Sequence, residues 1–284
     1  MRLSREEFWV LDVTAQMNCC IALAWLNRPN VDEVFNKSHH GLTTNQLADL
    51  LVFMQKQGDL AIYRNTEGMF SNPILPERAP QVRDVVDFTP VWENPVFYPK
   101  AAIIEDFFMA AERQKRYDRW QQRDMMYRET LSFCATRQGA EKWEETAQVD
   151  WNKYLDSRAS HPDDADLAEN QSLSYCHAKA LSEQTLDAWF DWKTRWDAHP
   201  DSFKASSFRR YHTERISPWK ATYWKTFPEG YECDYWELTV YRKEGMNKAE
   251  GDRHRIFHTQ SWQEHHALFD WCNSYVKDFP FEGD

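Results

Sequence analysis

Four histidines crowd together towards the end of the sequence: His254, His258, His265 and His266. If HRIFHT (254–259) is a strand, His254 and His258 share one face, and a following helix could turn His265 or His266 towards them. Imidazoles in this arrangement, with Cys272 nearby, could bind a transition metal. The spacing matches no recognised zinc pattern, so exposed or hydrogen-bonded histidines are favoured. We therefore predict no metal site and no cofactor.

A basic stretch, ERQKRYDRWQQRDMMYRE (112–129), could contact a polyanion. On a helix, Arg116, Arg119 and Arg123 recur on one side, interleaved with Tyr117 and Trp120, and such interleaving suits nucleic acid. Acidic residues four positions from several of these cations instead favour a solvated helix stabilised by ion pairs. The three arginines remain candidate polyanion contacts, and Tyr117 and Trp120 remain candidates for a protein interface.

Three tryptophans recur at spacings of three and four in AWFDWKTRW (188–196). On a helix they form one stripe, which is typical of a face packed on a core. We predict that Trp189 and Trp196 are buried, with Asp191 and Arg195 near water. A protein-interaction surface that uses Trp192 is the second interpretation, because tryptophan is enriched at binding hot spots. A ligand platform is the third, since such sites need a concavity that a linear sequence does not reveal.

Several catalytic motifs are missing from the sequence. The chain has 8 glycines and no GxG, so phosphate-cradling loops of the Rossmann and P-loop types are excluded. GxSxG and HExxH are also missing. The pattern leans against an enzyme, although a catalytic site assembled from distant residues stays open.

Composition and charge describe an ordinary globular chain with an acidic balance. Hydrophobic residues make up 42% and charged residues 28%, and the net charge is −11. That charge repels polyanions, so nucleic acid is disfavoured as a partner and another protein is favoured. The 6 cysteines form no CxxC, which fits reduced thiols in a cytoplasmic protein. No apolar run is long enough to span a bilayer, so no membrane association is expected.

The N-terminal part alternates helix signals with turn signals. SREEF (4–8) offers a serine cap for a helix running to about Leu26, and VDEVFNKSHH (31–40) predicts a second helix. Thr43 or Thr44 can cap a third helix, whose apolar positions Leu47, Leu50, Leu51 and Met54 keep a helical period. Gly58 then stands where a left-handed residue ends a helix. LAIYRN, TEG and MF indicate a hairpin.

Helix, helix, helix, glycine and hairpin is the order of a winged-helix module, and LTTNQLADLLVFMQKQGDLAIYRN resembles the third helix and wing of that superfamily. The resemblance covers about residues 5–75. It implies either DNA recognition through the third helix or protein docking. A DNA-reading helix needs cations, and this one offers Lys56 alone, with Arg64 in the wing. Residues 1–100 hold 9 Lys and Arg against 12 Asp and Glu, so docking is favoured over DNA reading.

Beyond this segment, proline punctuates residues 72–99, which predicts a linker. Helical patterns follow at about 101–157 and 171–198, separated by a loop at 161–170. Two strands around PEG are predicted in 220–243, a third at 254–259, and a closing helix at 261–279 with Ser261 and Glu264 in capping-box spacing.

The sequence therefore predicts an α+β protein that is mainly helical. It would have a winged-helix-like domain at 1–75, a proline-rich linker at 76–100, and a helical domain with a small antiparallel sheet and closing helix at 101–284. The favoured function is a binding or regulatory protein acting through protein contacts, such as an inhibitor or immunity-type partner. A winged-helix DNA-binding regulator is the alternative, and an unrecognised, metal-dependent enzyme is the third.

Overall fold

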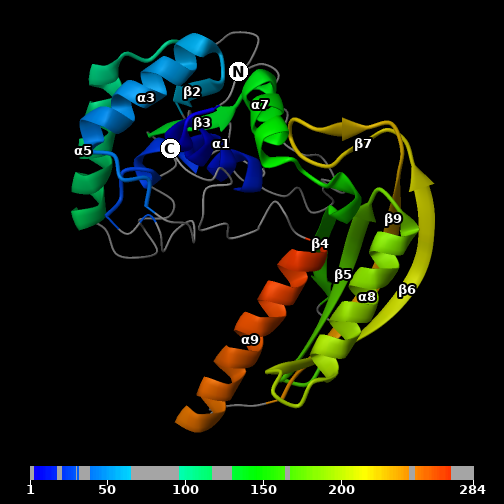
Figure 1. Ribbon diagram of the computed structural model, residues 1–284. Helices are drawn as coiled ribbons and strands as arrows, with labels where there is room; N and C mark the ends of the chain where they lie inside the picture. Colours follow the sequence, from blue (N-terminus) through cyan, green and yellow to red (C-terminus); the bar gives the residue numbers. More distant parts are fainter. Residues whose placement is uncertain are drawn as a thin grey trace. The chain divides into compact units, whose positions relative to one another are not determined.

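The computed structural model describes residues 3–17, 21–29, 31, 39–64, 96–116, 130–163, 167–242 and 247–269 (Figure 1). These residues form two compact units. Unit 1 contains those between 3 and 149 together with 222–224, and unit 2 contains 150–221 together with those between 225 and 269. Most of the linker expected at 76–100 and most of the helix expected at 31–40 lie outside the described residues.

Unit 1 combines helices with a three-stranded antiparallel sheet. Its described elements in chain order are α1 (Arg5–Met17), β1 (Ile21–Ala22), η1 (Leu23–Trp25), α3 (Thr44–Gln57), β2 (Leu60–Arg64), α5 (Lys100–Arg116), β3 (Leu131–Ala135) and α7 (Arg137–Ala147). The strand order is β1-β3-β2, so β3 is the central strand. Strand β2 therefore pairs with β3, from Leu60 opposite Ala135 to Arg64 opposite Leu131.

Helix α3 begins and ends where its sequence predicts. The Thr43 hydroxyl accepts the backbone N–H of Gln46, and the Gln46 side chain accepts the N–H of Thr43, which completes a capping box. Gly58 ends the helix with φ at 78°, a left-handed conformation that glycine adopts without steric cost. Leu47, Leu51 and Met54 are buried.

Three buried aspartates join the elements of unit 1. Asp12 on α1 accepts the indole N–H of Trp143 on α7 at 2.9 Å. Asp59, which precedes β2, forms an ion pair with Lys142 on α7 at 2.7 Å. Asp106 on α5 accepts the backbone N–H of Leu131 at the start of β3. Each carboxylate has a designated donor, which offsets the cost of burying its charge.

Unit 2 is built on a four-stranded antiparallel sheet. Its described elements in chain order are η2 (Trp151–Lys153), β4 (Leu155–Asp163), β5 (Gln171–Ala180), α8 (Glu183–Ala198), β6 (Lys204–Ile216), β7 (Trp219–Lys220), β8 (Thr226–Phe227), β9 (Gly230–Tyr241) and α9 (Lys248–Leu268). The main sheet has the order β4-β5-β9-β6, and β7 pairs with β8 separately. Figure 1 shows α8 lying along one face of the main sheet.

Alternation along the strands gives the main sheet two different faces. Cys176, Ala178 and Ala180 of β5, with Cys233 and Tyr235 of β9, form one core cluster with Leu186, Trp189, Phe190 and Trp192 of α8. We call this the helix-covered face. The intervening residues, which include His177 and Asp234, lie on the opposite face.

The expectation of a mainly helical protein is wrong. Helix accounts for 47% and strand for 29% of the described residues, which makes an α+β fold with a large sheet component. Strands β3 and β4 interrupt the helix expected at 101–157, and β5 replaces the first part of the one expected at 171–198. Strand β3 (LSFCA) is buried throughout, and a continuous apolar run does not distinguish strand from helix by periodicity.

Three other boundaries differ from expectation. Helix α1 ends at Met17, and Ile21–Ala22 is a short strand rather than part of the helix expected to reach Leu26. Residues 254–259 are helical, because Asn247 and Glu250 form a capping box that starts α9 well before Ser261. Of the two strands predicted around PEG, the second is confirmed as β9. The first is wrong, because its residues form only the short strands β7 and β8, which pair with each other. Strand β6 was not predicted.

No helix among the described residues combines the length and the apolar character needed to cross a bilayer.

Gly139 of α7 is a test of the packing in unit 1. A Cβ atom built on it would lie 2.1 Å from the backbone oxygen of Asp59. Gly139→Ala should therefore lower the free energy of unfolding of unit 1 by about 1–3 kcal/mol, measured by denaturant titration with circular dichroism. Gly251→Ala in α9 is the matched control, because a Cβ there meets no atom within 4 Å and should be tolerated. An unchanged transition for Gly139→Ala would contradict this contact.

Candidate functional site

A cavity in unit 2 lies between α8, α9 and the helix-covered face of the main sheet. It has a volume of about 300 Å³. Its lining residues come from five elements and are Ser157, Ala159, Cys176, Trp189, Trp192, Lys193, Trp196, Tyr235, Glu237, Trp262 and His265. We call this the aromatic pocket.

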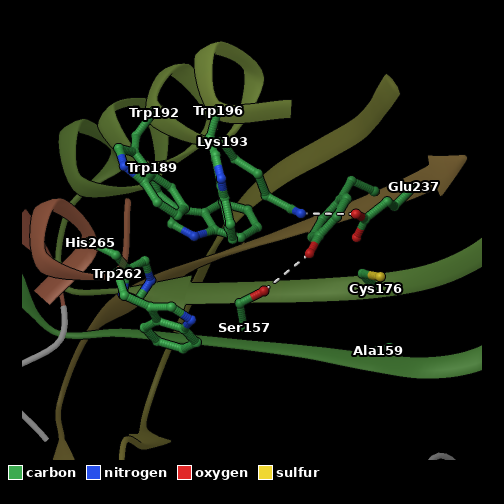
Figure 2. Close-up of a pocket in the computed structure, with 11 residues that line it drawn as sticks. Ser157, Ala159, Cys176, Trp189, Trp192, Lys193, Trp196, Glu237, Trp262 and His265 are labelled. Atoms are coloured by element: carbon green, nitrogen blue, oxygen red, sulfur yellow. Dashed lines mark hydrogen bonds and ion pairs between the residues drawn. The ribbon is translucent and has the colours of Figure 1, made fainter. Parts of the chain in front are cut away.

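Helix α8 positions four of these side chains because of its start and its spacing. The Ser182 hydroxyl accepts the backbone N–H of Thr185 and caps the helix, with Glu183 in the first turn. Trp189, Trp192 and Trp196 then recur on one side of the helix. Figure 2 shows them projecting from α8 above the strands.

The sheet beneath these indoles carries small side chains. Ser157 and Ala159 of β4 and Cys176 of β5 line the pocket. Because they extend only a short way from the sheet, they leave the space between the strands and the indole rings open. Large aliphatic side chains at these positions would fill the cavity.

Aromatic rings form the pocket walls through edge and tilted contacts. The Trp192 ring lies 4.9 Å from that of Trp196 and 4.8 Å from that of His265, between centroids. Trp189 contacts Tyr235 at 5.6 Å, and Trp262 of α9 contacts His265 at 5.6 Å. The walls thus present flat apolar surfaces, with a few polar atoms among them.

A group of charged side chains borders the pocket. The Lys193 ammonium lies 2.8 Å from Glu237 and 3.6 Å from Asp197, and Lys204 lies 3.8 Å from Glu237. Burial opposes ionisation of Glu237, but the attraction of Lys193, its hydrogen bond and Lys204 outweigh it, so the pKa of Glu237 falls below its usual value. Burial dominates for Asp197 and raises its pKa, although Lys193 opposes the shift. Glu237 is therefore the carboxylate that holds Lys193.

Two of the lining groups, a thiol and a phenol, have raised pKa values. Burial raises the pKa of the Cys176 thiol above its usual value. Burial also raises the pKa of the Tyr235 hydroxyl, whose oxygen lies 3.0 Å from that of Ser157. A thiol nucleophile needs a lowered pKa, so the Cys176 thiol is not activated as a nucleophile.

Two indole N–H groups of the pocket have no hydrogen-bond acceptor among the residues that the structure describes. The Nε1 atoms of Trp192 and Trp196 are buried, and neither has a hydrogen-bond acceptor within the described residues. Trp192 is 4% exposed as a whole residue. A buried donor without an acceptor costs about 1–3 kcal/mol, which a ligand acceptor would recover.

Of the predicted site residues whose side chains the structure describes, one lines this pocket. Trp192 lines it, and the expected burial of Trp189 is confirmed, while Trp196 is half-buried. Asp191 and Arg195 are exposed, as predicted. Lys56 and Arg64 are exposed in unit 1, and Lys56 lies over the Phe97 ring.

The basic stretch is mostly outside the described residues. Arg116 is the last residue of α5, and its side chain is not described. Arg119, Arg123, Tyr117 and Trp120 also lie outside the described part of the chain. Their role as polyanion or interface contacts stays a prediction.

The C-terminal histidines are arranged along a helix rather than between a strand and a helix. His254 and His258 are four residues apart on α9, with ring centroids 5.9 Å apart. The Trp262 indole donates to Nε2 of His258, and burial followed by repulsion from His254 lowers the His258 pKa. Cys272 lies outside the described residues. His265 instead faces the aromatic pocket, which its position in the sequence did not indicate.

Comparison with known proteins gives no relative: the chain matches no family model, no curated protein and no solved structure.

The Lys193–Glu237 pair predicts a pH-dependent contribution to stability. A carboxylate whose pKa is lower in the folded than in the unfolded chain stabilises the fold when the pH is above its ordinary pKa, here 4.5. This contribution is lost as the pH falls through the pKa of the folded state. Glu237→Gln should therefore lower the free energy of unfolding of unit 2 by about 1–3 kcal/mol at pH 7. The difference from wild type should shrink on acidification below 4.5.

Asp197→Asn is the matched control for that experiment. Its folded pKa is raised, so the ionised carboxylate is disfavoured in the fold, and removing its charge should not lower stability at pH 7. Denaturant titrations between about pH 3 and pH 7 measure the free energy of unfolding of both variants and of wild type. This range lies on either side of the ordinary carboxyl pKa of about 4. A loss for Glu237→Gln that does not change with pH would indicate a packing defect instead.

Proposed function

We propose that the protein is a binding protein whose unit 2 captures a small, flat, largely apolar molecule that carries a hydrogen-bond acceptor. The observation that carries the proposal is the pair of unpartnered indole N–H donors, of Trp192 and Trp196, in a cavity walled by aromatic rings. A volume of about 300 Å³ suits a compact molecule, and ligand sites typically combine apolar walls with few polar groups.

The polarity of the pocket favours an acceptor over a cation. Aromatic cages for quaternary ammonium groups present ring faces to the charge. Here the Lys193 ammonium already borders the rings, and a second cation would be repelled by it. A carboxylate or carbonyl oxygen would instead accept from an indole N–H. Two ammonium groups, of Lys193 and Lys204, lie beside the one carboxylate of lowered pKa, Glu237, and this excess positive charge favours an acceptor. An aromatic carboxylate combines both properties.

Binding is better supported than catalysis. The raised pKa values of Cys176 and Tyr235 keep both groups protonated, and Glu237 is engaged by Lys193. Nucleophilic chemistry needs an activated group, so we assign Cys176, Tyr235 and Glu237 to positioning and shielding a ligand. A regulatory protein that responds to this ligand is the function that we infer, with a cytoplasmic location as part of the proposal.

Docking to another protein is the second candidate function, through unit 1. Phe53 is 42% exposed on α3, and Val96 and Phe97 are 59% and 51% exposed beside it in the segment that precedes α5. Phe97 lies within 5.9 Å of Lys56, one turn from Phe53 on α3. Exposed rings next to a cation are typical of protein interfaces.

The winged-helix assignment of unit 1 is likewise a proposal. Its support is the order β1-β3-β2 with α3 directly before β2, although residues 65–130 separate the two strands that would form the wing. On α3, Asp49 forms an ion pair with Lys100, and Lys56 is the only cation. These charges favour protein docking over DNA reading, which needs several phosphate contacts.

Isothermal titration calorimetry with a matched set of probes tests the ligand class. We expect 2-naphthoate to bind the full chain, naphthalene to bind more weakly, and 2-naphthylmethylammonium not to bind. Trp192→Phe and Trp196→Phe keep an aromatic ring but remove the N–H donor. Each should weaken naphthoate binding about tenfold, the equivalent of one charge-assisted hydrogen bond.

Trp236→Phe is the matched control, because Trp236 lies on the opposite face of the same sheet beside Tyr175. It should leave the naphthoate affinity unchanged. Preference for the ammonium probe, or equal affinities for all variants, would contradict an acceptor-binding pocket.

A further inference from the structure

A second cluster of chemically capable side chains lies on the face of the unit 2 sheet opposite the aromatic pocket. His177 on β5 stands directly opposite Asp234 on β9, and Glu232 is two residues from Asp234 on the same strand. Side chains two residues apart on a strand share a face. The three groups therefore come together because β5 and β9 pair in this register.

The spacing of their ligand atoms suits a metal ion. One ligand atom from each residue lies within 4.8 Å of the others. Nδ1 of His177 contacts the Asp234 carboxylate and lies 3.6 Å from Oε1 of Glu232. Two ligands bound tetrahedrally to Zn²⁺ at about 2.1 Å lie about 3.4 Å apart, so small side-chain adjustments place an ion among the three.

Burial distinguishes this cluster from an ordinary charged surface. His177 is 8% exposed and Glu232 is 3% exposed, whereas the Asp234 side chain is 28% exposed. His177 and Glu232 are thus buried, and Asp234 is the most exposed of the three. Buried carboxylates need a compensating positive charge, and the Lys179 ammonium is 3.7 Å from Glu232.

The imidazole of His177 contacts the two carboxylates with one of its two ring nitrogens. Both carboxylates face Nδ1, while the buried Nε2 has no hydrogen-bond partner in the described part of the chain. A histidine with a purely structural role in a core normally uses both ring nitrogens. The arrangement instead concentrates a nitrogen and two oxygen ligands at one point.

A fourth ligand stands on the neighbouring strand. His212 of β6 lies directly opposite Asp234, and its side chain is 73% exposed. Directly paired residues of antiparallel strands share a face and have Cβ atoms about 5 Å apart, so His212 lies on the same face as the cluster and beside it. We propose that His177, Glu232 and Asp234 form a site for one divalent first-row transition ion, with His212 completing the coordination.

The donor set selects the class of ion. Imidazole nitrogen favours zinc, iron, copper and nickel over magnesium, which prefers oxygen ligands and retains its water. Zn²⁺ is the best probe, because it accepts both imidazole nitrogen and carboxylate oxygen as ligands. Mg²⁺ should not bind with comparable affinity.

Calorimetric titration of metal-free full-length protein with Zn²⁺ and with Mg²⁺ tests the proposal. One equivalent of Zn²⁺ should bind to wild type, and Asp234→Asn should weaken that equivalent at least tenfold, because it removes a charged ligand without changing side-chain size. Absence of a Zn²⁺ equivalent in wild type would overturn the proposal.

Lys179→Met is a second variant with the opposite expected effect. It removes an ammonium that repels the ion, so Zn²⁺ should bind more tightly, and the rise in melting temperature on adding Zn²⁺ should be larger. Unchanged or weaker binding would contradict an ion beside Glu232. This variant keeps the proposal testable if Asp234→Asn fails to fold.

The double variant His254→Ala/His258→Ala controls for the imidazole pair on α9. It should retain the Zn²⁺ equivalent. Loss of binding here, with retention in Asp234→Asn, would place the ion on α9 and overturn the assignment to the sheet. Trp192→Phe should leave Zn²⁺ binding unchanged. The test of the metal site is therefore independent of the test of naphthoate binding in the aromatic pocket.

Discussion

The pairing of β9 between β5 and β6 is the constraint on which both candidate sites depend. Successive side chains of a strand point to opposite faces, so one strand contributes Tyr235 and Glu237 to the aromatic pocket and Glu232 and Asp234 to the opposite face. A register shift of one residue would move charged groups beneath the tryptophans of α8. The register that satisfies the core therefore also assembles the charged cluster.

The helices with strong local signals could be predicted from the sequence. Thr43 and Gln46 provide reciprocal caps for α3, and Gly58 provides its left-handed end, so the information lies within the helix itself. Strand β5 lacks such a signal. Its helix-covered face carries Cys176, Ala178 and Ala180, while its opposite face carries larger side chains, so the usual contrast of apolar and polar faces is missing.

Only one side of the aromatic pocket could be predicted from the sequence, for a related reason. The spacing of Trp189, Trp192 and Trp196 correctly indicates one face of a helix. Whether that face closes onto a filled core depends on the residues opposite, and these include Ser157 and Ala159 in a segment whose pattern resembled helix. Small side chains opposite large ones create the space, and this is a property of tertiary pairing rather than of any one segment.

The sheet of unit 1 depends in the same way on a strand that is distant in the sequence, β3. Among the described strands, β1 and β2 both pair with β3 and not with each other. Residues 65–130 lie between β2 and β3 in the chain. During synthesis, the strand with which β1 and β2 both pair in the described structure becomes available only when Leu131–Ala135 has left the ribosome. This is several seconds after Arg64, at about 5–20 residues per second. Assembly of this sheet is thus a late, non-local event, in which α3 with its own caps can form first.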